Sequence, residues 1–375
     1  MPSPCSSRTC AARRLRPNAG IRSRTTRRRP AVLNSDVQTE PRAARKVAVL
    51  GSGSWGTTFA KILADGGADV AMWARRPELA REISQSKRNS DYLPGINLPR
   101  SIWASSRLPE VLEGAEQVYV SVPAQSLREN LLIVRELIPA DAIVISLMKG
   151  VEKGTRFRMS QVIDQELRIG ADRVAVVSGP NLALEIAKEQ PTAAVVSSQS
   201  LETATTVAMT ATNPYFRSYV NTDVIGTEFG GVLKNLIAVA IGIVDGVGYG
   251  ENTKASIITR GLVEMTDFAV AFGGRAETLA GLAGLGDLIA TCESSLSRNN
   301  TAGRLLGQGY SFSDVVKQMN QTAEGLSSVA PILELALSKG VEMPIVSQVA
   351  EVLAGTLDPR DIAPHLTTDP MPQGE

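Results

Sequence analysis

Lys234 lies in a stretch, residues 230–242, that has almost no other polar side chain. Read at 3.6 residues per turn, the stretch is apolar on nearly every face, which predicts a buried helix. A buried ammonium group is costly unless it is paired or has a function. A lysine whose amine reaches solvent near a helix end is the alternative. As a functional group, Lys234 could protonate an oxygen on which negative charge develops.

Two further groups could share a site with this lysine. Lys149 lies in the segment SLMKG, at the carboxyl end of a predicted strand, where open α/β sheets bind ligands. Asp287 follows the glycine-rich segment GLAGLG and could also be an ordinary helix N-cap. A second cation near Lys234 would lower its pKa from about 10.4 toward the working pH, whereas Asp287 would oppose that shift.

Other acid/base chemistries lack the residues they need. The only histidine, His365, lies near the C-terminus, which argues against a His–carboxylate dehydrogenase. None of the six tyrosines is followed four residues later by Lys, as the Tyr-x-x-x-Lys chemistry requires. No Cys/His cluster could hold zinc, and no metal is expected.

The glycine pattern GSGSWG, residues 51–56, follows the first predicted strand and opens a predicted helix. In that position it predicts a dinucleotide site, with a tight turn without ligand as the alternative. The next strand ends in Arg75 and Arg76, where an acidic residue would select the ribose of NAD. Two guanidiniums favour a 2′-phosphate, so we expect NADP to be tolerated, although the pair could simply be solvated.

A third group of residues could bind the substrate. Ser297, Arg298 and Asn299 supply a hydroxyl, a guanidinium and an amide at a predicted helix start. This combination suits a phosphate monoester, and a capped surface helix is the alternative. The segments SVP (121–123) and SGPN (178–181) follow two further predicted strands at the ligand-binding edge of the sheet.

These residues need a fold that brings them together. Short apolar runs alternate with amphipathic stretches from Lys46, which predicts a doubly wound Rossmann-type parallel sheet with helices on both faces. The predicted strands are 46–50, 69–74, 117–122, 142–147, 173–177, 193–197 and 216–220. Helical periodicity follows over 231–245, 255–271, 278–291, 299–307, 325–339 and 343–354. We therefore expect a dinucleotide-binding domain over 46–224, an all-helical substrate and catalytic domain over 225–358, and a polar tail over 359–375.

The first 45 residues differ in charge from the rest. The chain of 375 residues has a formal net charge of +1. Its first 45 residues contain eleven Arg and only two acidic residues. The remainder has 28 basic and 36 acidic residues, and this acidity argues against nucleic-acid binding. A segment rich in Arg, Ser and Thr predicts a disordered transit peptide. A basic nucleic-acid-binding arm and a wrongly assigned start are the alternatives. We expect a chloroplast protein, with a mitochondrial or cytoplasmic location as alternatives.

Two compositional features bear on the compartment. Cys292 is the only cysteine beyond the first 45 residues, which excludes a disulfide framework and fits a reducing compartment. No uninterrupted apolar run approaches the roughly 18 residues needed to cross a bilayer, so no membrane span is expected.

The motifs together resemble the NAD(P)-dependent glycerol-3-phosphate dehydrogenases over about residues 46–355. The likeness rests on GSGSWGTTFA, SLMKG, SGPNLALEIA, GGVLKNLIAVAIGIVDG, TKASIITRGLVEM, GLAGLGDLIATC and LSRN. It implies reversible hydride transfer, with NAD or NADP, between the cofactor and dihydroxyacetone phosphate. The product, sn-glycerol 3-phosphate, would supply glycerolipid synthesis, and the enzyme would be a homodimer.

The resemblance also implies roles for single residues. Lys234 would be the acid/base, with Lys149 and Asp287 as its partners. Cofactor contacts would come from Gly51, Gly53, Ser54, Trp55, Gly56, Arg75, Arg76, Lys149, Ala183, Arg298 and Glu324. Substrate contacts would come from Lys149, Gly179, Asn181, Lys234, Asp287, Ser297, Arg298 and Asn299. A β-hydroxyacid dehydrogenase or ketopantoate reductase and a non-catalytic nucleotide-binding module are the alternative functions.

Overall fold

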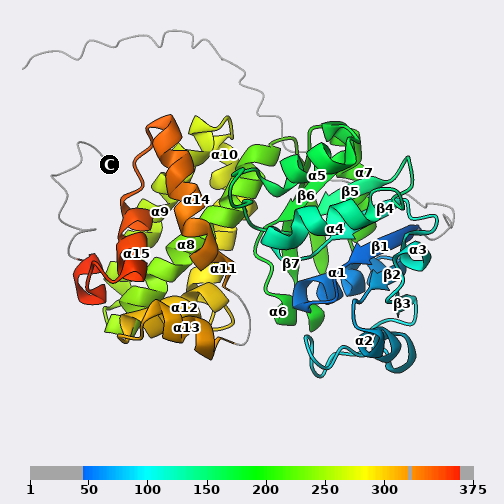
Figure 1. Ribbon diagram of the computed structural model, residues 1–375, viewed down its shortest axis with the longest axis horizontal. Coiled ribbons are helices and arrows are strands. Elements are labelled where there is room, and N and C mark those ends of the chain that lie inside the picture. The colour runs from blue at the N-terminus through cyan, green and yellow to red at the C-terminus, as the bar shows by residue number, and fades with distance from the viewer. Residues whose placement is uncertain (1–44, 320–322, 364–375) are drawn as a thin grey trace, which may run out of the picture. The chain divides into compact units, whose positions relative to one another are not determined.

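The computed structural model describes residues 45–319 and 323–363, and its first half is built on an eight-stranded sheet (Figure 1). The strands are β1 (Lys46–Leu50), β2 (Asp69–Trp73), β3 (Ile102–Ser105), β4 (Gln117–Val120), β5 (Ile143–Ser146), β6 (Val174–Ser178), β7 (Thr192–Ser198) and β8 (Phe216–Asn221). Their order is β3-β2-β1-β4-β5-β6-β7-β8. The predicted doubly wound α/β fold of this half is confirmed.

Two features of the sheet differ from the prediction. The short strand β3 was not predicted, and it pairs with β2 at the sheet edge. β7 runs antiparallel to β6, so the sheet is not wholly parallel. The connection between them contains only the short helix α6 (Ala183–Ala187), which packs against α1 (Ser54–Asp65). The hydroxyl of Thr58 on α1 donates a hydrogen bond to the carbonyl oxygen of Ala183. The chain therefore stays at the carboxyl edge of β6 and re-enters the sheet from there.

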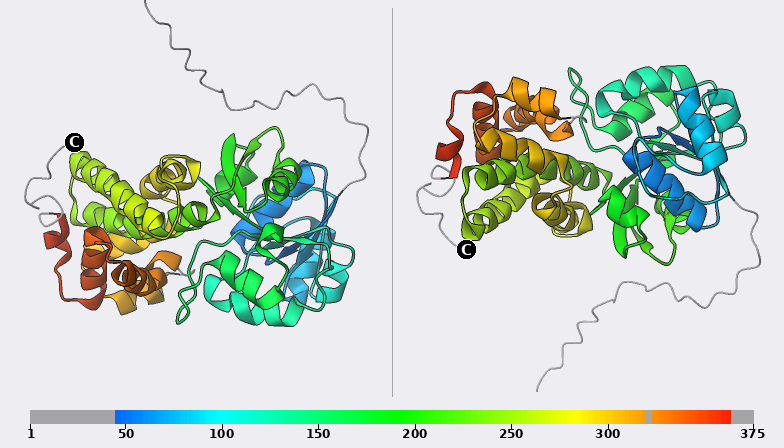
Figure 2. Two further views of the ribbon diagram at one scale, coloured as in Figure 1. Left: turned by 90° about the horizontal axis from the view of Figure 1, so that it is seen from above. Right: turned by 90° about the horizontal axis from the view of Figure 1, so that it is seen from below.

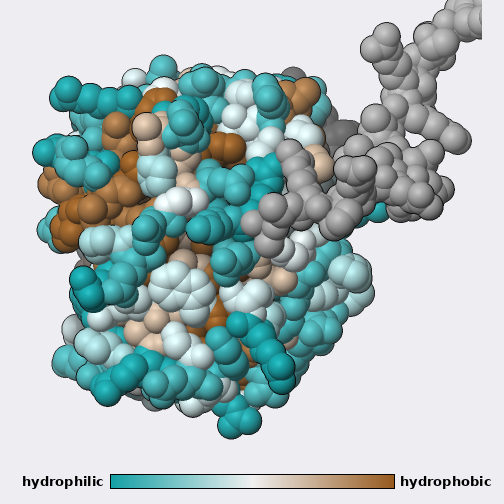
Figure 3. All heavy atoms as spheres, turned by 90° about the vertical axis from the view of Figure 1, so that its right-hand side faces the viewer, coloured by the Kyte–Doolittle hydropathy of each residue, from teal (hydrophilic) through white to brown (hydrophobic). Residues whose placement is uncertain are grey.

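Alternate residues of the central strand β1 face two separate apolar layers. Val47 and Val49 belong to one buried cluster, whereas Ala48 and Leu50 belong to the other. The period of two explains why a strand buried on both faces is apolar throughout. Helices cover the two faces: α1, α2 (Pro77–Arg81), α3 (Leu108–Leu112), α4 (Leu127–Val134), α5 (Met159–Leu167), α6 and α7 (Leu201–Ala211). The face of this half seen in Figure 3 is mostly hydrophilic, with its largest apolar area at the upper left of the view.

The second half is helical, as predicted, and is organised around one long helix, α8 (Val224–Val247). Around it lie α9 (Glu251–Ala271), α10 (Ala276–Leu279), α11 (Asp287–Glu293), α12 (Arg298–Gly307), α14 (Glu324–Lys339) and α15 (Pro344–Ala354), with α13 (Phe312–Gln318) beyond α12. Figures 1 and 2 show α8 enclosed by these helices. Packing continues past residue 358, because Ile362 and Ala363 are buried in the same core. His365 lies outside the described residues.

The composition of α8 reflects this central place. Among the described residues it is the one helix long and apolar enough to cross a membrane, but 83% of its most apolar window is buried inside the protein. Its N-terminus is capped by Asp223, which accepts a hydrogen bond from the backbone N–H of Gly226. The helix is therefore the core of the helical half.

Helix α12 lies unusually close to α8 because glycines face each other across the contact. A Cβ added at Gly303 would lie 2.1 Å from the carbonyl oxygen of Val239 and 2.9 Å from the Cα of Gly242. A Cβ at Gly307 would lie 2.2 Å from the carbonyl oxygen of Ile243. The two backbones touch directly, and this contact sets where the first turn of α12, with Arg298 and Asn299, lies relative to α8.

Substitution of Gly303 by Ala should therefore destabilise the protein. The added methyl group has no space, and overpacking of this kind costs about 1–3 kcal/mol or more. Gly250→Ala is the matched control, since no atom lies within 4 Å of its added Cβ. Urea unfolding of both variants measures the difference. Equal stabilities for the two variants would contradict the close contact of α8 with α12.

Candidate active site

Lys234 lies in the middle of α8 with only 7% of its surface exposed. Its Nζ donates hydrogen bonds to Asp287 Oδ1 at 2.7 Å and to Thr291 Oγ1 at 2.5 Å. The amine is therefore paired inside the protein, and the alternative of a solvated lysine near a helix end does not describe it.

Asp287 reaches Lys234 because the chain before it packs directly on α8. The predicted helix over 278–291 is divided into α10, a π-helical turn (Leu282–Gly286) and α11. A Cβ added at Gly230 would lie 2.4 Å from the carbonyl oxygen of Ala283, so only glycine allows this contact. Asp287, the first residue of α11, is 1% exposed. Thr291 follows one helical turn later, on the same face of α11.

Lys149 enters the same site from the sheet half. Its Nζ donates to Asp287 Oδ2 at 2.6 Å and to the carbonyl oxygen of Gly179 at 3.0 Å. The stem of Lys149 crosses α8 at Gly231, where an added Cβ would lie 3.3 Å from Lys149 Cγ and 2.8 Å from Ser178 Oγ. One carboxylate thus lies between two ammonium groups, one from each half of the protein.

The environment shifts the ionisation of this group of side chains. Burial lowers the pKa of Lys234 to about 8; Asp287 opposes this shift and the charge of Lys149 adds to it. The sequence argument named Lys149 as the cause, whereas burial is the larger one. Burial also raises the pKa of Cys292 to about 12, so its thiol stays neutral beside Lys234. An amine with a pKa near 8 can both give and take a proton at neutral pH.

The glycine loop has the form that a pyrophosphate needs. Gly51 has φ +124°, and its added Cβ would lie 2.1 Å from the carbonyl oxygen of Ser121. An added Cβ at Gly56 would lie 2.3 Å from the carbonyl oxygen of Gly51. At Gly53, in contrast, no atom lies within 4 Å, and no side chain caps the N-terminus of α1. The backbone N–H groups of this turn are open to an anion, which fits a dinucleotide.

The loop is braced by a residue that the sequence did not reveal. Asn89, 1% exposed, donates to the carbonyl oxygen of Ser52 at 2.8 Å and to Thr57 Oγ1 at 2.8 Å. Ser54 Oγ donates to the carbonyl oxygen of Tyr92 at 2.7 Å. The indole nitrogen of Trp55 is buried without a partner among the described residues. A single Asn in a polar stretch carries no local signal of this contact.

Arg75 and Arg76, alike in the sequence, differ in the structure. Arg76 is bound to Asp91 at 2.5 Å and lies 5.9 Å from the ring centre of Tyr92. Arg75 is exposed and makes no hydrogen bond or ion pair with any residue that the structure describes. Only Arg75 is therefore available for an anion without breaking an existing ion pair.

The segment after β6 presents unpaired polar atoms beside Lys149. Gly179 has φ +129°, a conformation that favours glycine, and its carbonyl turns to Lys149. Both amide atoms of Asn181 and the hydroxyl of Ser178 are buried without a partner in the described part of the chain. Buried polar groups are usually paired, so unpaired ones on the segment that holds Lys149 indicate a place for a polar ligand.

The predicted phosphate-binding segment begins α12. Ser297 Oγ accepts a hydrogen bond from the N–H of Asn300 at 3.2 Å, so it is a helix cap, the alternative considered above. Asn299 Oδ1 accepts from the N–H of Gly325 at 3.0 Å, which joins α12 to the start of α14. Arg298 is exposed at the first position of α12. Burial raises the pKa of Glu324 on α14, and the charge of Arg298 opposes this rise.

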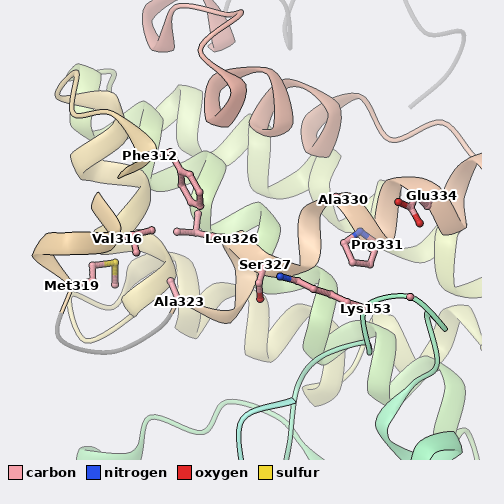
Figure 4. A pocket seen from close by; sticks show the side chains of 11 residues that line it. Lys153, Phe312, Val316, Met319, Ala323, Leu326, Ser327, Ala330, Pro331 and Glu334 are labelled. Atoms are coloured by element: carbon pink, nitrogen blue, oxygen red, sulfur yellow. The ribbon is translucent and has the colours of Figure 1, made fainter. Parts of the chain in front are cut away.

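A separate cavity of about 610 Å³ lies between α13, α14 and the loop that contains Lys153 and Gly154. Figure 4 shows the side chain of Lys153 extending toward Ser327, with Phe312 and Leu326 on the apolar side. Lys149, Lys234 and Asp287 do not line this cavity. It is therefore distinct from the paired lysines.

Comparison with known proteins identifies the family. The family model described as NAD-dependent glycerol-3-phosphate dehydrogenase N-terminus matches residues 46–204, and the corresponding C-terminus matches residues 223–364. The chain belongs to this family. It is 76% identical over 327 residues to glycerol-3-phosphate dehydrogenase [NAD(P)+] of Leifsonia xyli, covering 87% of this chain and 89% of that protein. It is 50% identical to that of Thermobifida fusca, over 84% and 94% of the two chains.

Solved structures agree with this assignment. Glycerol-3-phosphate dehydrogenase from Coxiella burnetii superposes with a TM-score of 0.81 at 36% identity, covering 87% of this chain and 99% of that one. A ketopantoate reductase family protein from Ralstonia eutropha shares only the fold, with a TM-score of 0.54 at 17% identity. Membership of the glycerol-3-phosphate dehydrogenase family therefore replaces the two alternatives considered from the sequence, a hydroxyacid dehydrogenase or ketopantoate reductase and a non-catalytic nucleotide-binding module.

The predicted chloroplast location is wrong. The similar proteins just described from Leifsonia xyli and Thermobifida fusca are bacterial, and bacteria have no plastids. The transit-peptide interpretation rested on an excess of arginine in residues 1–45, almost all of which lie outside the described residues. Composition alone cannot distinguish a targeting segment from another arginine-rich sequence.

Gly53→Ala tests the open glycine turn. Because no atom lies near the added Cβ, the fold should keep its melting temperature. The methyl group should instead occupy the space that a pyrophosphate needs and weaken NADH binding at least about tenfold, a change of roughly 1.4 kcal/mol. Fluorescence titration with NADH and a thermal melt measure the two effects. Unchanged NADH affinity would contradict the assignment of this loop.

Proposed function

We propose that Lys234 is the acid/base of a reversible reduction of dihydroxyacetone phosphate to sn-glycerol 3-phosphate. As a member of its family the chain is an oxidoreductase that uses NAD or NADP. The observation that carries the proposal is the buried amine of Lys234, held by Asp287 and Thr291 beside a second ammonium group. NAD(P)H supplies the hydride when bound.

Lys234 would donate the proton in the reduction and accept it in the oxidation. In reduction, negative charge develops on the C2 oxygen, and the protonated amine of Lys234 stabilises it and then donates a proton. In oxidation, the neutral amine takes the proton from the C2 hydroxyl. Burial keeps the pKa of Lys234 near 8, where both forms are populated at neutral pH.

Lys149 and Asp287 would hold the amine of Lys234 in place. Asp287 accepts hydrogen bonds from both lysines and fixes the direction of each amine. The two ammonium groups and one carboxylate leave a net positive charge, which favours an anionic substrate. Lys149 would contact the substrate oxygens, and the amide of Asn181, without a partner among the described residues, lies on the segment whose Gly179 carbonyl holds Lys149.

The phosphate group of the substrate would bind at the start of α12. We assign it to Arg298, the backbone N–H groups at the start of its first turn and the amide nitrogen of Asn299. Ser297 would contribute indirectly, because its hydroxyl caps α12 and so fixes the first turn of the helix. Glu324 and Ala183 would border the cofactor, and Arg75 would contact a 2′-phosphate of NADP without losing an ion pair.

The finer parts of the assignment are also proposals. The divisions at residues 46–224 and 225–358 follow the change from sheet to helices after β8. We propose a homodimer, and the supply of sn-glycerol 3-phosphate for glycerolipid synthesis, from the likeness to the family alone.

Lys234→Met should abolish most of the turnover. The substitution roughly keeps the side-chain volume but removes the proton donor, so kcat for dihydroxyacetone phosphate reduction should fall about 10²–10⁴-fold. NADH affinity should be largely kept. Lys61→Met is the matched control, because Lys61 is also buried and paired, with Asp65 and Glu189, but lies on α1 away from Lys234. Near-normal turnover in Lys234→Met would refute the assignment.

The two directions of the reaction should show opposite pH dependences. Reduction needs protonated Lys234, so its kcat/KM should fall as the pH rises through about 8. Oxidation needs the neutral amine, so its kcat/KM should rise through the same pH. Steady-state rates from about pH 6 to 10, in one buffer series at constant ionic strength, measure both limbs. Profiles without an ionisation in this range would argue against Lys234 as the proton carrier.

A further inference from the structure

Glu228 is a buried carboxylate on α8 that has no part in the site described so far. It is 6% exposed and accepts three hydrogen bonds from the start of α5. The donors are Arg158 Nη1 at 2.5 Å, the backbone N–H of Ser160 at 2.8 Å and Ser160 Oγ at 2.5 Å. Because α5 belongs to the sheet half, Glu228 joins the two halves of the protein.

The segment that Glu228 holds is the one that carries Lys149. Val151 forms an isolated antiparallel bridge with Arg158, so residues 151–158 make a closed loop. Val151 is fully buried and packs in the core of the helical half. The segment is therefore anchored to the helical half at Val151 and again, through Arg158 and Ser160, at Glu228.

Successive neighbours on α8 organise these contacts. Glu228, Gly231 and Lys234 follow at intervals of three residues, so Gly231 neighbours both Glu228 and Lys234 on the helix surface. Glu228 and Lys234 are six positions apart, which corresponds to about 9 Å along the helix axis. Gly231, between them, is the place where the stem of Lys149 crosses. The carboxylate that holds the segment and the amine that Lys149 faces thus lie on one rigid element.

We propose that Glu228 is a positioning residue for the dehydrogenase reaction, which through Arg158 and Ser160 fixes Lys149 against Asp287 and Lys234. The inference rests on the roles proposed above for Lys149 and Lys234. Loss of the carboxylate charge would release the start of α5 and let the 149–158 segment shift. A displacement of about 1 Å in such a group can lower a rate about 10²-fold.

A second buried glutamate allows a matched control. Glu264 on α9 is 5% exposed and accepts hydrogen bonds from the backbone N–H groups of Ile345 at 3.0 Å and Val346 at 3.1 Å, at the start of α15. Like Glu228, it binds the first turn of a neighbouring helix, but it holds no segment of the active site. If both residues had only a structural role, Glu228→Gln and Glu264→Gln would change stability and leave the kinetic constants alone.

The experiment compares steady-state kinetics and melting temperatures of the two variants of the full chain. We expect Glu228→Gln to lower kcat/KM for dihydroxyacetone phosphate about 10–100-fold and Glu264→Gln to leave it unchanged. The pKa seen in the pH profile of Glu228→Gln should rise, because the charge of Lys149, which lowers the pKa of Lys234, would lie farther away. Equal kinetic constants in the two variants would overturn the proposal.

A double variant covers the case in which Glu228→Gln folds poorly. Removing one partner of a buried ion pair leaves an unpaired charge, whereas removing both is often neutral for stability. Glu228→Gln combined with Arg158→Met should therefore regain stability and keep the kinetic defect. Recovery of wild-type kcat/KM in the double variant would overturn the proposal.

Lys149→Met separates this inference from the proposed function. Full turnover in Lys149→Met would remove the role of Lys149 and the inference with it. A large loss of turnover in Lys149→Met together with normal kinetic constants in Glu228→Gln would overturn only the inference about Glu228. The proposed function would then stand.

Discussion

A single carboxylate between two ammonium groups is the interaction on which the site depends. Asp287 is almost fully buried and accepts hydrogen bonds from Lys234 and from Lys149. Without it, two like charges would face each other in a region with little water, and a buried charge that loses its partner is strongly destabilising. With it, the site keeps one excess positive charge and an amine whose pKa lies near neutrality. The same arrangement ties the sheet half to the helical half, since one lysine comes from each.

Glycines in α8 make this arrangement possible. Gly230 admits the turn that carries Asp287, Gly231 admits the stem of Lys149, and Gly242 admits the backbone of α12. Glycine within a helix costs roughly 0.5–1 kcal/mol relative to alanine. Burial of the helix on nearly all sides offsets that cost, because its apolar residues fill the core of the helical half. The core helix therefore also serves as the surface on which the site is assembled.

The sequence predicted correctly the secondary-structure elements that form from interactions between neighbouring residues. The strand, glycine turn and helix at residues 46–65 and the buried helix around Lys234 follow from periodicity and turn chemistry. The reversed strand β7, the bracing of the glycine loop by Asn89 and the pairing of Glu228 with Arg158 did not. Each depends on contacts between segments tens of residues apart, which leave no local signal. Arg75 and Arg76 were indistinguishable for the same reason, because Asp91 binds only one of them.

Direct titration of the Lys234 amine tests the central claim most simply. Protein labelled with ¹⁵N at the lysine side chains, compared with Lys234→Met to assign the signal, reports the ionisation of this one group by NMR. The account predicts a midpoint near pH 8 for Lys234. A midpoint above about 10, as for a lysine in water, would contradict a buried amine held between Asp287 and Lys149.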